Sequence, residues 1–512
     1  MAETPKRCQV EMGDGKRCGR ELYDGEHCIF HSKKEDKDLN LFHGEFYQIF
    51  NDKSLNTYDF TGFIFPEGVV FLKKFSKPVN FVGAIFKGDV DFSNVTFEDE
   101  ALFAGAKFKC EANFLDAAFK NRGLFPQTEF EGVAIFSDAT FKGRADFLFA
   151  RFTHTAWFRK ATFEAGAGFD GTDFVGEADF GHTTFKGAAD FLSTLFHGNV
   201  KFSVARFHAE FKFEGSTFKG QVDFQSATFN AGAYFIGSIF EADADFRGAT
   251  FEHTLLIGAE RVHRRAFKGG TNLGWVQFSK PEKVGFHKVD LSSVRFLGTD
   301  VRKVHFNDVD WYKEKGKGRN RVFDEVSPDP DTEKFDYPLI AQLYRRFRAN
   351  YEENLRYSEA GDFYIGEMEM TRKAERNIFK QLPLLIYKAI SNYGESYYRP
   401  LGWLAAFLVV IFPLLFMILG LQPINPVPNS PEAYVMDYKW DISSIQSFLP
   451  SRQKLNDYGI SFLYTMSVFS LVRDKKYTTI NNWGHALFVA ESILTPVFMA
   501  FFLLALRRRF KR

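Results

Sequence analysis

Phenylalanine recurs along the middle of this chain at a fixed spacing, and this spacing limits the fold more than any other feature. From Phe81 to Phe251 the Phe positions are five and six residues apart in alternation, so the pattern repeats every eleven residues. Sixteen such units fill residues 81–256, and all 32 expected positions are Phe, half of the 64 in the chain. Neither a helix nor a simple strand has this period. The stretch is therefore predicted to be a repeat structure with a geometry of its own.

The residues beside each Phe indicate short extended segments joined by corners. A small or β-branched residue, often Ala, stands two positions before each Phe, which places both side chains on one face of an extended segment. Gly recurs after the second Phe of a unit, where it suits a corner that needs either a positive φ or a close backbone approach. Asp or Asn often precedes the first Phe and is expected to point outward. Because no unit can bury its Phe alone, the coils must stack through main-chain hydrogen bonds.

These small-(Asp/Asn)-Phe units resemble the pentapeptide-repeat family. The resemblance implies a mainly β fold, a right-handed quadrilateral β-helix, over residues 40–311. It covers the eleven-residue units of 81–256 and returns at 289–311, where residues five apart are Leu291, Phe296, Val301, Phe306 and Trp311. Four faces would use 22 residues per coil, so the regular region would form eight coils. The eleven-residue unit is one residue longer than two pentapeptides, and the resemblance implies no activity.

The charge of the chain argues against nucleic acid as a partner. Its 65 Lys and Arg balance 64 Asp and Glu, whereas a protein that binds nucleic acid through bulk electrostatics carries a basic excess. Some pentapeptide-repeat proteins imitate DNA, which requires an acidic rod. Residues 81–256 hold 24 acidic and 16 basic residues, and the two signs are mixed throughout. We interpret this as an ordinary solvated surface, which leaves room for a protein partner.

Two stretches near the C-terminus are long and apolar enough to cross a bilayer. Residues 401–421 contain no charge, and Tyr397, Tyr398 and Trp403 at their start are typical of a membrane interface. Residues 485–506 contain one acid, Glu491, and are followed by a basic tail that favours a cytoplasmic C-terminus. Two spans then place the N-terminal part in the cytoplasm as well. We expect a multi-pass protein of the cell (inner) membrane.

A third apolar stretch, residues 458–472, lies between the spans and is too short to cross but suits a re-entrant helix. Span, short helix, loop and span together resemble the two-transmembrane pore module of tetrameric ion channels, over residues 395–512. The resemblance implies a homo-tetramer and candidate pore residues Ser467, Ser470 and Glu491. A potassium channel would carry Thr-Val-Gly-Tyr-Gly after the pore helix, but residues 467–473 read SVFSLVR and contain no Gly. Glu491 is either a pore-facing group or a hydrated residue near the outer interface.

Four residues near the N-terminus have the pattern of a structural metal site. Cys8, Cys18, Cys28 and His31 supply three thiolates and an imidazole within residues 1–35, a normal tetrahedral set for zinc. His27 is a competing ligand. Few apolar residues surround the group, so the metal would supply folding energy. The pattern resembles small Cys3His knuckles at the N-termini of bacterial proteins, whereas Cys110 lies in the repeat and is expected to be an ordinary small side chain.

The rest of the chain predicts linkers and no catalytic site. Residues 312–337 are charged and read as a loop, and residues 338–394 read as a helical connector with helices over 339–354 and 363–379. Glu367 and Glu369 have no catalytic partner in the sequence, and no nucleotide or hydrolase motif is present, so we expect no enzyme. The sequence therefore predicts a bacterial membrane protein with a cytoplasmic β-helix and an ion-channel-like module. The alternative is a non-conducting, membrane-anchored scaffold for a protein partner.

Overall fold

The structure is a computed structural model that describes residues 7–258, 266–316, 318–330, 332–424, 452–470 and 476–510. It separates into two compact units that divide between Asn350 and Tyr351, and each unit is described by itself. The first holds the Phe repeats and the second holds most of the helices. The residues expected to complete the re-entrant segment, Leu471 and Val472, lie outside the described residues.

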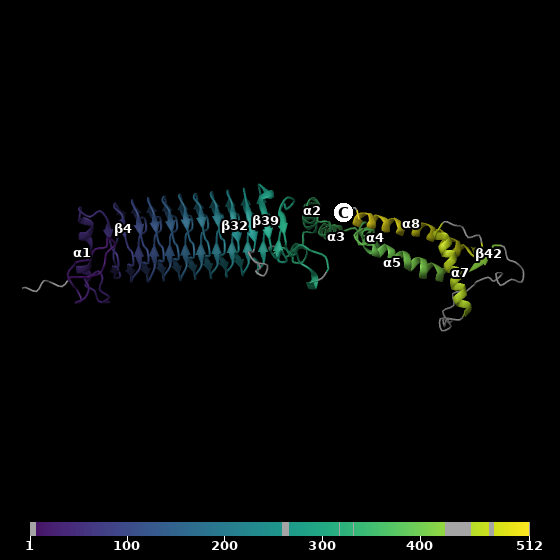
Figure 1. The fold of residues 1–512 in the computed structure, drawn as a ribbon, viewed down its shortest axis with the longest axis horizontal. Helices are drawn as coiled ribbons and strands as arrows, with labels where there is room; N and C mark the ends of the chain where they lie inside the picture. Colours follow the sequence, from purple (N-terminus) through teal and green to yellow (C-terminus); the bar gives the residue numbers. More distant parts are fainter. Residues whose placement is uncertain are drawn as a thin grey trace, which may run out of the picture. The chain divides into compact units, whose positions relative to one another are not determined.

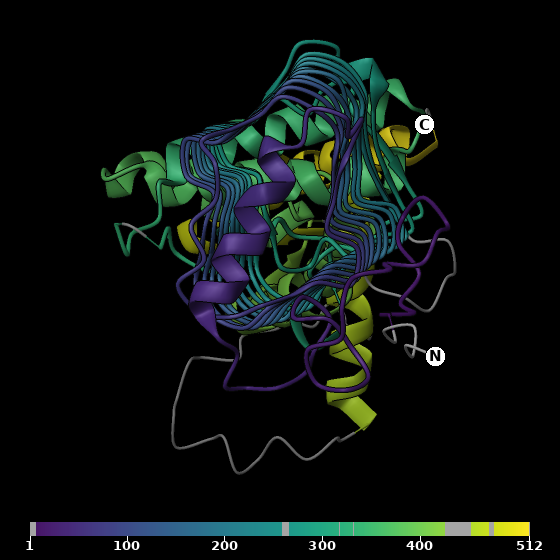
Figure 2. The ribbon, with the colours of Figure 1, turned by 90° about the vertical axis from the view of Figure 1, so that its left-hand side faces the viewer.

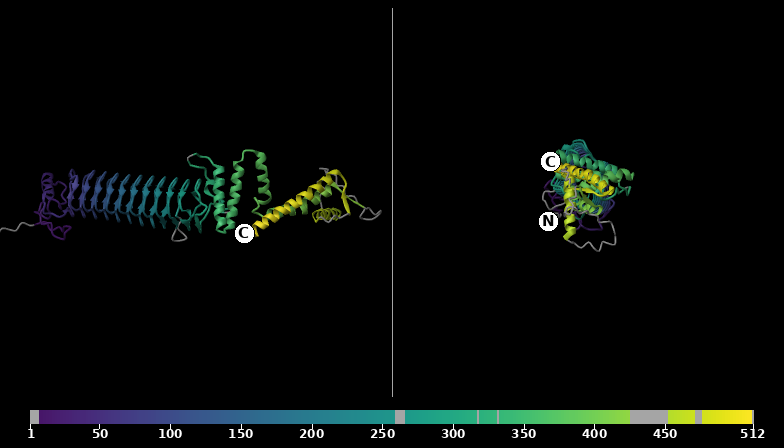
Figure 3. Two further views of the ribbon diagram at one scale, coloured as in Figure 1. Left: turned by 90° about the horizontal axis from the view of Figure 1, so that it is seen from above. Right: turned by 90° about the vertical axis from the view of Figure 1, so that its right-hand side faces the viewer.

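The first unit contains a β-solenoid of about 11 turns, in which each coil has four short sides. In the regular region each strand pairs in parallel with the strand four positions later, and the partners are 22 residues apart, as in Ile85 with Lys107. The coils stack as successive layers, seen from the side in Figure 3 and along the solenoid in Figure 2. The expected four-sided coil of 22 residues is therefore confirmed.

Four sheets, one on each side of the solenoid, contain all of the described strands of this unit. The first sheet contains β1 (Tyr58–Asp59), β4 (Val79–Asn80), β8 (Ala101–Leu102), β12 (Gly123–Leu124), β16 (Ala145–Asp146), β20 (Ala167–Gly168), β24 (Ala189–Asp190), β28 (Phe211–Lys212), β32 (Ala233–Ile236), β36 (Leu255–Gly258), β39 (Val284–His287) and β41 (His305–Asn307). The second contains β2 (Ile64–Phe65), β5 (Ile85–Phe86), β9 (Lys107–Phe108), β13 (Glu129–Phe130), β17 (Arg151–Phe152), β21 (Asp173–Phe174), β25 (Leu195–Phe196), β29 (Thr217–Phe218) and β33 (Ile239–Phe240).

The remaining two sheets have ten strands each. One contains β6 (Val90–Asp91), β10 (Ala112–Asn113), β14 (Ala134–Ile135), β18 (Ala156–Trp157), β22 (Ala178–Asp179), β26 (Val200–Lys201), β30 (Val222–Asp223), β34 (Ala244–Asp245), β37 (Thr271–Asn272) and β40 (Val294–Arg295). The other contains β3 (Lys74–Phe75), β7 (Thr96–Phe97), β11 (Ala118–Phe119), β15 (Thr140–Phe141), β19 (Thr162–Phe163), β23 (Thr184–Phe185), β27 (Arg206–Phe207), β31 (Thr228–Phe229), β35 (Thr250–Phe251) and β38 (Gln277–Phe278).

The repeated Phe side chains form the core of the solenoid. All 32 are buried, and because each coil has four sides they stand in four stacks. Neighbours within a stack are nearly parallel, as in Phe103 and Phe125, whose ring centroids are 4.7 Å apart at 2°. Rings of different stacks meet edge to face, as in Phe125 and Phe136 at 5.4 Å and 85°. Both arrangements are favourable for aromatic rings and add to the gain from burying them.

The structure shows why Gly recurs at one kind of corner of the coil. At Gly132, Gly187 and their equivalents the backbones of successive coils approach closely, and an added Cβ at Gly187 would lie 0.9 Å from the carbonyl oxygen of Ala165. The positive φ angles occur at the other kind of corner, two residues after the first Phe of a unit, as at Asp116 and Asp138. The Gly residues that follow the second Phe of a unit thus serve the close approach and not a left-handed conformation.

The Asp and Asn residues that precede the first Phe have a structural role that the sequence analysis did not assign. Their side-chain oxygen accepts a hydrogen bond from the N–H two residues later, as Asp146 does from Leu148 at 2.9 Å. The same bond joins Asn113 to Leu115. Each such side chain holds a corner in shape while the residue stays at the surface. Charged side chains also pair between coils, as Lys107 does with Glu129 at 2.8 Å.

Helices and turns cover both ends of the solenoid. Helix α1 (Leu39–Asn51) lies across the first coil and buries Phe42, Phe46 and Ile49, so the strands begin only at Tyr58 (Figure 2). The turn η1 (Pro281–Lys283) precedes β39, and at the other end come the short turns η2 (Glu314–Gly316) and η3 (Phe323–Glu325). Within the first part of α2 (Tyr337–Glu353), Phe347 packs on Trp311 at 4.8 Å. Among the described residues, α1 and the first part of α2 thus pack at the two ends, where a sheet edge could otherwise join another chain.

The second unit is helical (Figure 1). Its helices are α3 (Tyr357–Ala374), α4 (Ile378–Ser391), α5 (Tyr398–Ala406), the π-turn η4 (Phe407–Ile411), α6 (Phe412–Leu419), α7 (Arg452–Phe469) and α8 (Asn482–Phe510), with the antiparallel strands β42 (Leu421–Pro423) and β43 (Tyr477–Thr479). The connector thus holds three helices, α2 to α4, where the sequence analysis expected two. The Asn377 side chain accepts a hydrogen bond from Phe379 N–H and starts α4, which ends the expected second helix early.

Candidate metal centre and membrane module

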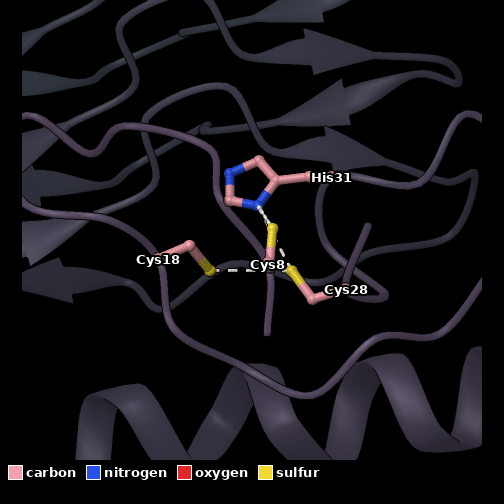
Figure 4. Close-up of side chains that lie close together, drawn as sticks. All are labelled: Cys8, Cys18, Cys28 and His31. Carbon is pink, nitrogen blue, oxygen red and sulfur yellow. Dashed lines mark hydrogen bonds between the residues drawn. The ribbon is translucent and has the colours of Figure 1, made fainter. Parts of the chain in front are cut away.

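The four expected metal ligands come together beside the first coil of the solenoid (Figure 4). Their ligand atoms all lie within 4.8 Å of one another. Cys28 Sγ is 3.2 Å and Cys8 Sγ is 3.5 Å from His31 Nδ1, and the Sγ atoms of Cys18 and Cys28 are 3.7 Å apart. Cys8, Cys28 and His31 are buried. The group could hold a metal ion, and three sulfurs with one nitrogen suit a tetrahedral ion.

Neighbouring groups orient these ligands. His31 Nε2 is 3.0 Å from the carbonyl oxygen of Thr61, so Nε2–H donates to that oxygen and leaves Nδ1 free to act as a ligand. Arg20 Nη1 donates to Cys18 Sγ at 3.2 Å. The hydrogen bond with Cys28 is the main cause that lowers the pKa of the Cys18 thiol, and Arg20 adds to it. A lowered pKa favours the thiolate that binds metal.

The remaining candidate His and the fourth Cys of the chain lie apart from this group. His27, the competing ligand, is not in the cluster, and its Nδ1 is 3.8 Å from Asp24 Oδ1. Cys110 lies in the repeat and donates from Sγ to the carbonyl oxygen of Lys87 at 3.3 Å. The cluster is attached to the solenoid through Phe30, which stacks on Phe63 at 4.4 Å. An ion held here would therefore brace the N-terminal end of the solenoid.

The C-terminal unit contains two helices long and apolar enough to cross a membrane. They are Tyr398–Leu419, made of α5, η4 and α6, and Asn482–Arg508 within α8. Pro413 leaves the carbonyl of Val409 without its usual helical donor, and the hydroxyl of Tyr458 on α7 donates to that carbonyl. The Tyr458 hydroxyl thus replaces the hydrogen bond that the carbonyl loses because Pro413 has no N–H.

Helix α7 packs against both of these helices. Tyr464 belongs to a cluster with Phe412 and Phe416 of α6, and Leu487 and Phe488 of α8 pack on the same cluster. Farther along α7, Phe469 packs on a second cluster that contains Phe498 of α8. The two clusters fix how α7 and α8 lie along one another. Between these two levels α8 also exposes side chains such as Ile493, so only part of the helix faces the interior of the bundle.

The three candidate pore residues have different surroundings. The Ser467 hydroxyl donates to the carbonyl oxygen of Tyr464 at 2.7 Å, and the Ser470 hydroxyl donates to that of Ser467 at 3.3 Å. Glu491 is fully buried in the bundle, and neither carboxylate oxygen has a hydrogen-bond partner among the described residues. Within the described residues Glu491 is therefore not at a hydrated surface, which argues against the interfacial interpretation. The structure does not bring it together with the two serines in any recorded contact.

Glu491 has polar companions that the sequence analysis missed. Ser461 and Thr465 of α7 and Thr495 of α8 are buried, and their hydroxyls have no recorded partner. In the sequence, Ser461 and Thr465 stand on either side of Tyr464, and Thr495 follows Glu491 by four residues on α8. The signal was present in the sequence, because polar residues four apart in an apolar segment share one face of a helix. The sequence analysis missed it because it compared only the residues after the pore helix with a potassium-channel filter.

Glu369 of the connector is part of an ion-pair network. Its carboxylate lies 3.0 Å from Lys388 Nζ and 3.1 Å from Arg372 Nη2, and the Tyr393 hydroxyl donates to it at 2.6 Å. Burial acts to raise the pKa of this carboxyl, but the hydrogen bonds from Tyr393, Lys388 and Arg372 outweigh it and lower the pKa. The network joins α3 to α4, as expected for structural ion pairs.

Comparison with known proteins identifies the repeats. The family described as pentapeptide repeats matches residues 74–121, 125–173, 150–195 and 213–259. An uncharacterized protein of Methanocaldococcus jannaschii is 27% identical over 180 residues, which cover 31% of this chain and 38% of that protein. The match thus spans well under half of the relative's length. No solved structure matches the chain. The chain therefore contains a pentapeptide-repeat domain with the fold of a β-solenoid, followed by a helical C-terminal unit.

Proposed function

We propose that this is an integral protein of the cell (inner) membrane, in which a cytoplasmic pentapeptide-repeat solenoid is attached to a pore-forming two-span module. The observation that carries the proposal is α7, a short helix between two apolar helices that packs on both of them. A re-entrant helix of this kind is the element that builds a pore entrance when several copies surround an axis. Both termini would lie in the cytoplasm, and the pore would require a homo-oligomer, with four copies as the expected number.

The pore would not select potassium in the known way. The stretch after α7 begins with Ser470 and has no Gly, and its residues Leu471 to Arg473 lie outside the described residues. Without a ring of closely spaced carbonyls, an ion keeps most of its hydration shell. We therefore expect a pore that distinguishes Na⁺ from K⁺ weakly.

Ion flux through the full chain tests this proposal. The protein would be reconstituted in vesicles, and Na⁺ and K⁺ efflux would be measured beside the number of copies per assembly in native-like lipid. We expect flux of both ions and a fourfold assembly. Ser470→Arg would add a charge at the exposed end of α7 and should reduce cation flux, whereas the uncharged Ser470→Asn at the same position is its control. Absence of flux from every oligomer would contradict the pore.

A non-conducting membrane-anchored scaffold is the second candidate. It is favoured by Glu491, which is buried inside the bundle of a single chain instead of facing an opening between copies. The pentapeptide-repeat β-solenoid also usually serves as a scaffold and not as an enzyme. In this case one side of the solenoid would bind a protein, and nucleic acid is not expected. One or two copies per assembly, without flux, would favour this function.

We also propose that Cys8, Cys18, Cys28 and His31 bind Zn²⁺ as a structural ion. The donor set, its burial and the orientation of His31 by Thr61 support this. We expect one zinc per chain by elemental analysis of the purified protein and none in Cys28→Ser. Cys110→Ser is the matched control and should keep its zinc. An unchanged metal content in Cys28→Ser would contradict the site.

A further inference from the structure

Helix α4 carries an apolar face that its own unit leaves exposed. The large side chains on this face are Ile378, Phe379, Leu382, Leu385 and Ile386, and Phe379 is 81% exposed. Their spacing of one, four, seven and eight residues places them on one side of the helix. Exposed apolar residues in a contiguous row of this kind mark a surface that contacts another apolar phase.

The opposite side of α4 is held against the ends of the two apolar helices. Tyr387 packs on Phe501 of α8 at 5.9 Å, and Ile390 packs on the cluster of Leu404, Leu408 and Phe498. The Trp403 indole donates to the carbonyl oxygen of Ala389 at 3.3 Å. The orientation of α4 about its own axis is therefore fixed, and the apolar face cannot turn inward.

The groups around α4 are those of a membrane interface. It meets the first turns of α5, where Tyr397, Tyr398 and Trp403 lie, and the last turns of α8, where Arg508 donates to the carbonyl oxygen of Tyr393 at 3.1 Å. Arg376, Lys380 and Arg399 are exposed beside it. Aromatic and basic side chains gather where the chain passes from hydrocarbon to headgroups, and basic ones favour the anionic cytoplasmic leaflet.

We infer that α4 lies in the plane of the membrane, with its apolar face in the headgroup and upper acyl region of the cytoplasmic leaflet and its basic residues on anionic headgroups. This inference rests on the proposed membrane placement of the two apolar helices and adds a third lipid contact. A second copy of the chain is the competing occupant, but Arg376 and Arg399, which are exposed near the two ends of α4, would repel their counterparts there. The helix would resist movement of α3 and the connector away from the bilayer.

Tryptophan fluorescence in brominated lipid tests the location of α4. Phe379→Trp in the full chain would be placed in phosphatidylcholine–phosphatidylglycerol vesicles, with bromine either high or low on the acyl chains. We expect lipid brominated near the headgroups to remove most of the emission that Trp at position 379 adds. Lys380→Trp on the same helix should lose less, and Phe149→Trp at an exposed position of the solenoid should lose none.

The outcomes separate this inference from the proposed function. If native Trp403, measured as the difference from Trp403→Phe, is quenched but the Trp at 379 is not, α4 lies outside the lipid and the inference is wrong. If Trp403 is not quenched either, the membrane placement itself is wrong. Oxidative cross-linking of Phe379→Cys between copies, at a rate above that of the unmodified chain, would show that a second copy covers the face and would also overturn the inference.

Discussion

The solenoid and the C-terminal helical unit treat their apolar side chains in opposite ways. In the solenoid every repeated Phe is buried against Phe residues of the coils before and after it. In the helical unit large apolar residues such as Phe379, Leu401 and Leu504 stay exposed. The solenoid thus completes its core within one chain, whereas the helical unit leaves many large apolar side chains exposed. The difference teaches that the apolar surface open to another apolar phase belongs mainly to the helical unit.

The same contrast holds for buried acids. Asp324 in the first unit accepts hydrogen bonds from the N–H groups of Phe296 and Leu297, so both of its oxygens have donors. Glu491 in the second unit has no such donor among the described residues. A buried acid with donors is part of a cap, whereas one without donors marks a place where function outweighs stability.

Addition of one methyl group to a glycine should affect the free energy of unfolding very differently in the two regions, and this is the largest difference that we expect. Gly187→Ala places its Cβ against the carbonyl of Ala165 in the preceding coil, so the free energy of unfolding should fall by more than about 4 kcal/mol. Gly402→Ala in α5 meets nothing within 4 Å and should be neutral or stabilising by about 1 kcal/mol. Chemical denaturation followed by circular dichroism measures both. Destabilisation by Gly402→Ala would reveal that a second copy packs on α5.

Removal of one ring tests whether the solenoid core is rigid. Phe147→Ala leaves a cavity between Phe125 and Phe169, whose ring centroids each lie 4.9 Å from that of Phe147, and should cost about 3 to 5 kcal/mol. Phe149→Asn is the control, since Phe149 is exposed and has a φ of 54° that Asn tolerates. We expect a change within about 0.5 kcal/mol for the control. Equal losses in the two variants would show that the stacks do not carry the stability of the solenoid.

Asp324 predicts a pH dependence of the first unit. Complete burial raises the pKa of this carboxyl to about 6, from an ordinary value of 3.8. Because the folded state then holds the proton more tightly than the unfolded state, stability falls as pH rises from about 4 to 6. The loss amounts to at most about 3 kcal/mol. Asp324→Asn should remove this slope in denaturation curves measured across the range, and an unchanged slope would assign it to other groups.

Substitution of Glu491 should give the smallest change in stability. The sign of this change distinguishes a carboxylate without a partner from one that other copies or ions satisfy. If the carboxylate has no partner in the assembled protein, Glu491→Gln removes the cost of burying an ionisable group and stabilises the helical unit by about 1 to 2 kcal/mol. Ser492→Ala on the exposed side of α8 is the control and should change little. Thermal unfolding in lipid measures both variants. Destabilisation by Glu491→Gln would show that other copies or ions satisfy the carboxylate.

The regular part of the fold could be predicted because its information is local and repeated. Each unit contains a core Phe, a small residue two positions before it and a corner residue. Because sixteen units repeat this order, only one assignment of residues to core and corner fits all of them. The ligands Cys8, Cys18, Cys28 and His31 were recognisable from residue type, although only the folded chain separates them from His27. Helix α4 was missed because a capping Asn at position 377 interrupts a pattern that otherwise reads as one helix.

By itself, the sequence determined the four-sided solenoid and the two apolar helices and predicted the candidate metal ligands, because spacing and composition decide which side chains must leave water. Only the tertiary structure decided that the Gly corners serve close backbone approach, that Ser461, Thr465 and Thr495 are buried as Glu491 is, and that α4 turns its apolar face outward. These features depend on contacts between segments far apart in the chain, and no local pattern specifies the direction in which a packed helix faces.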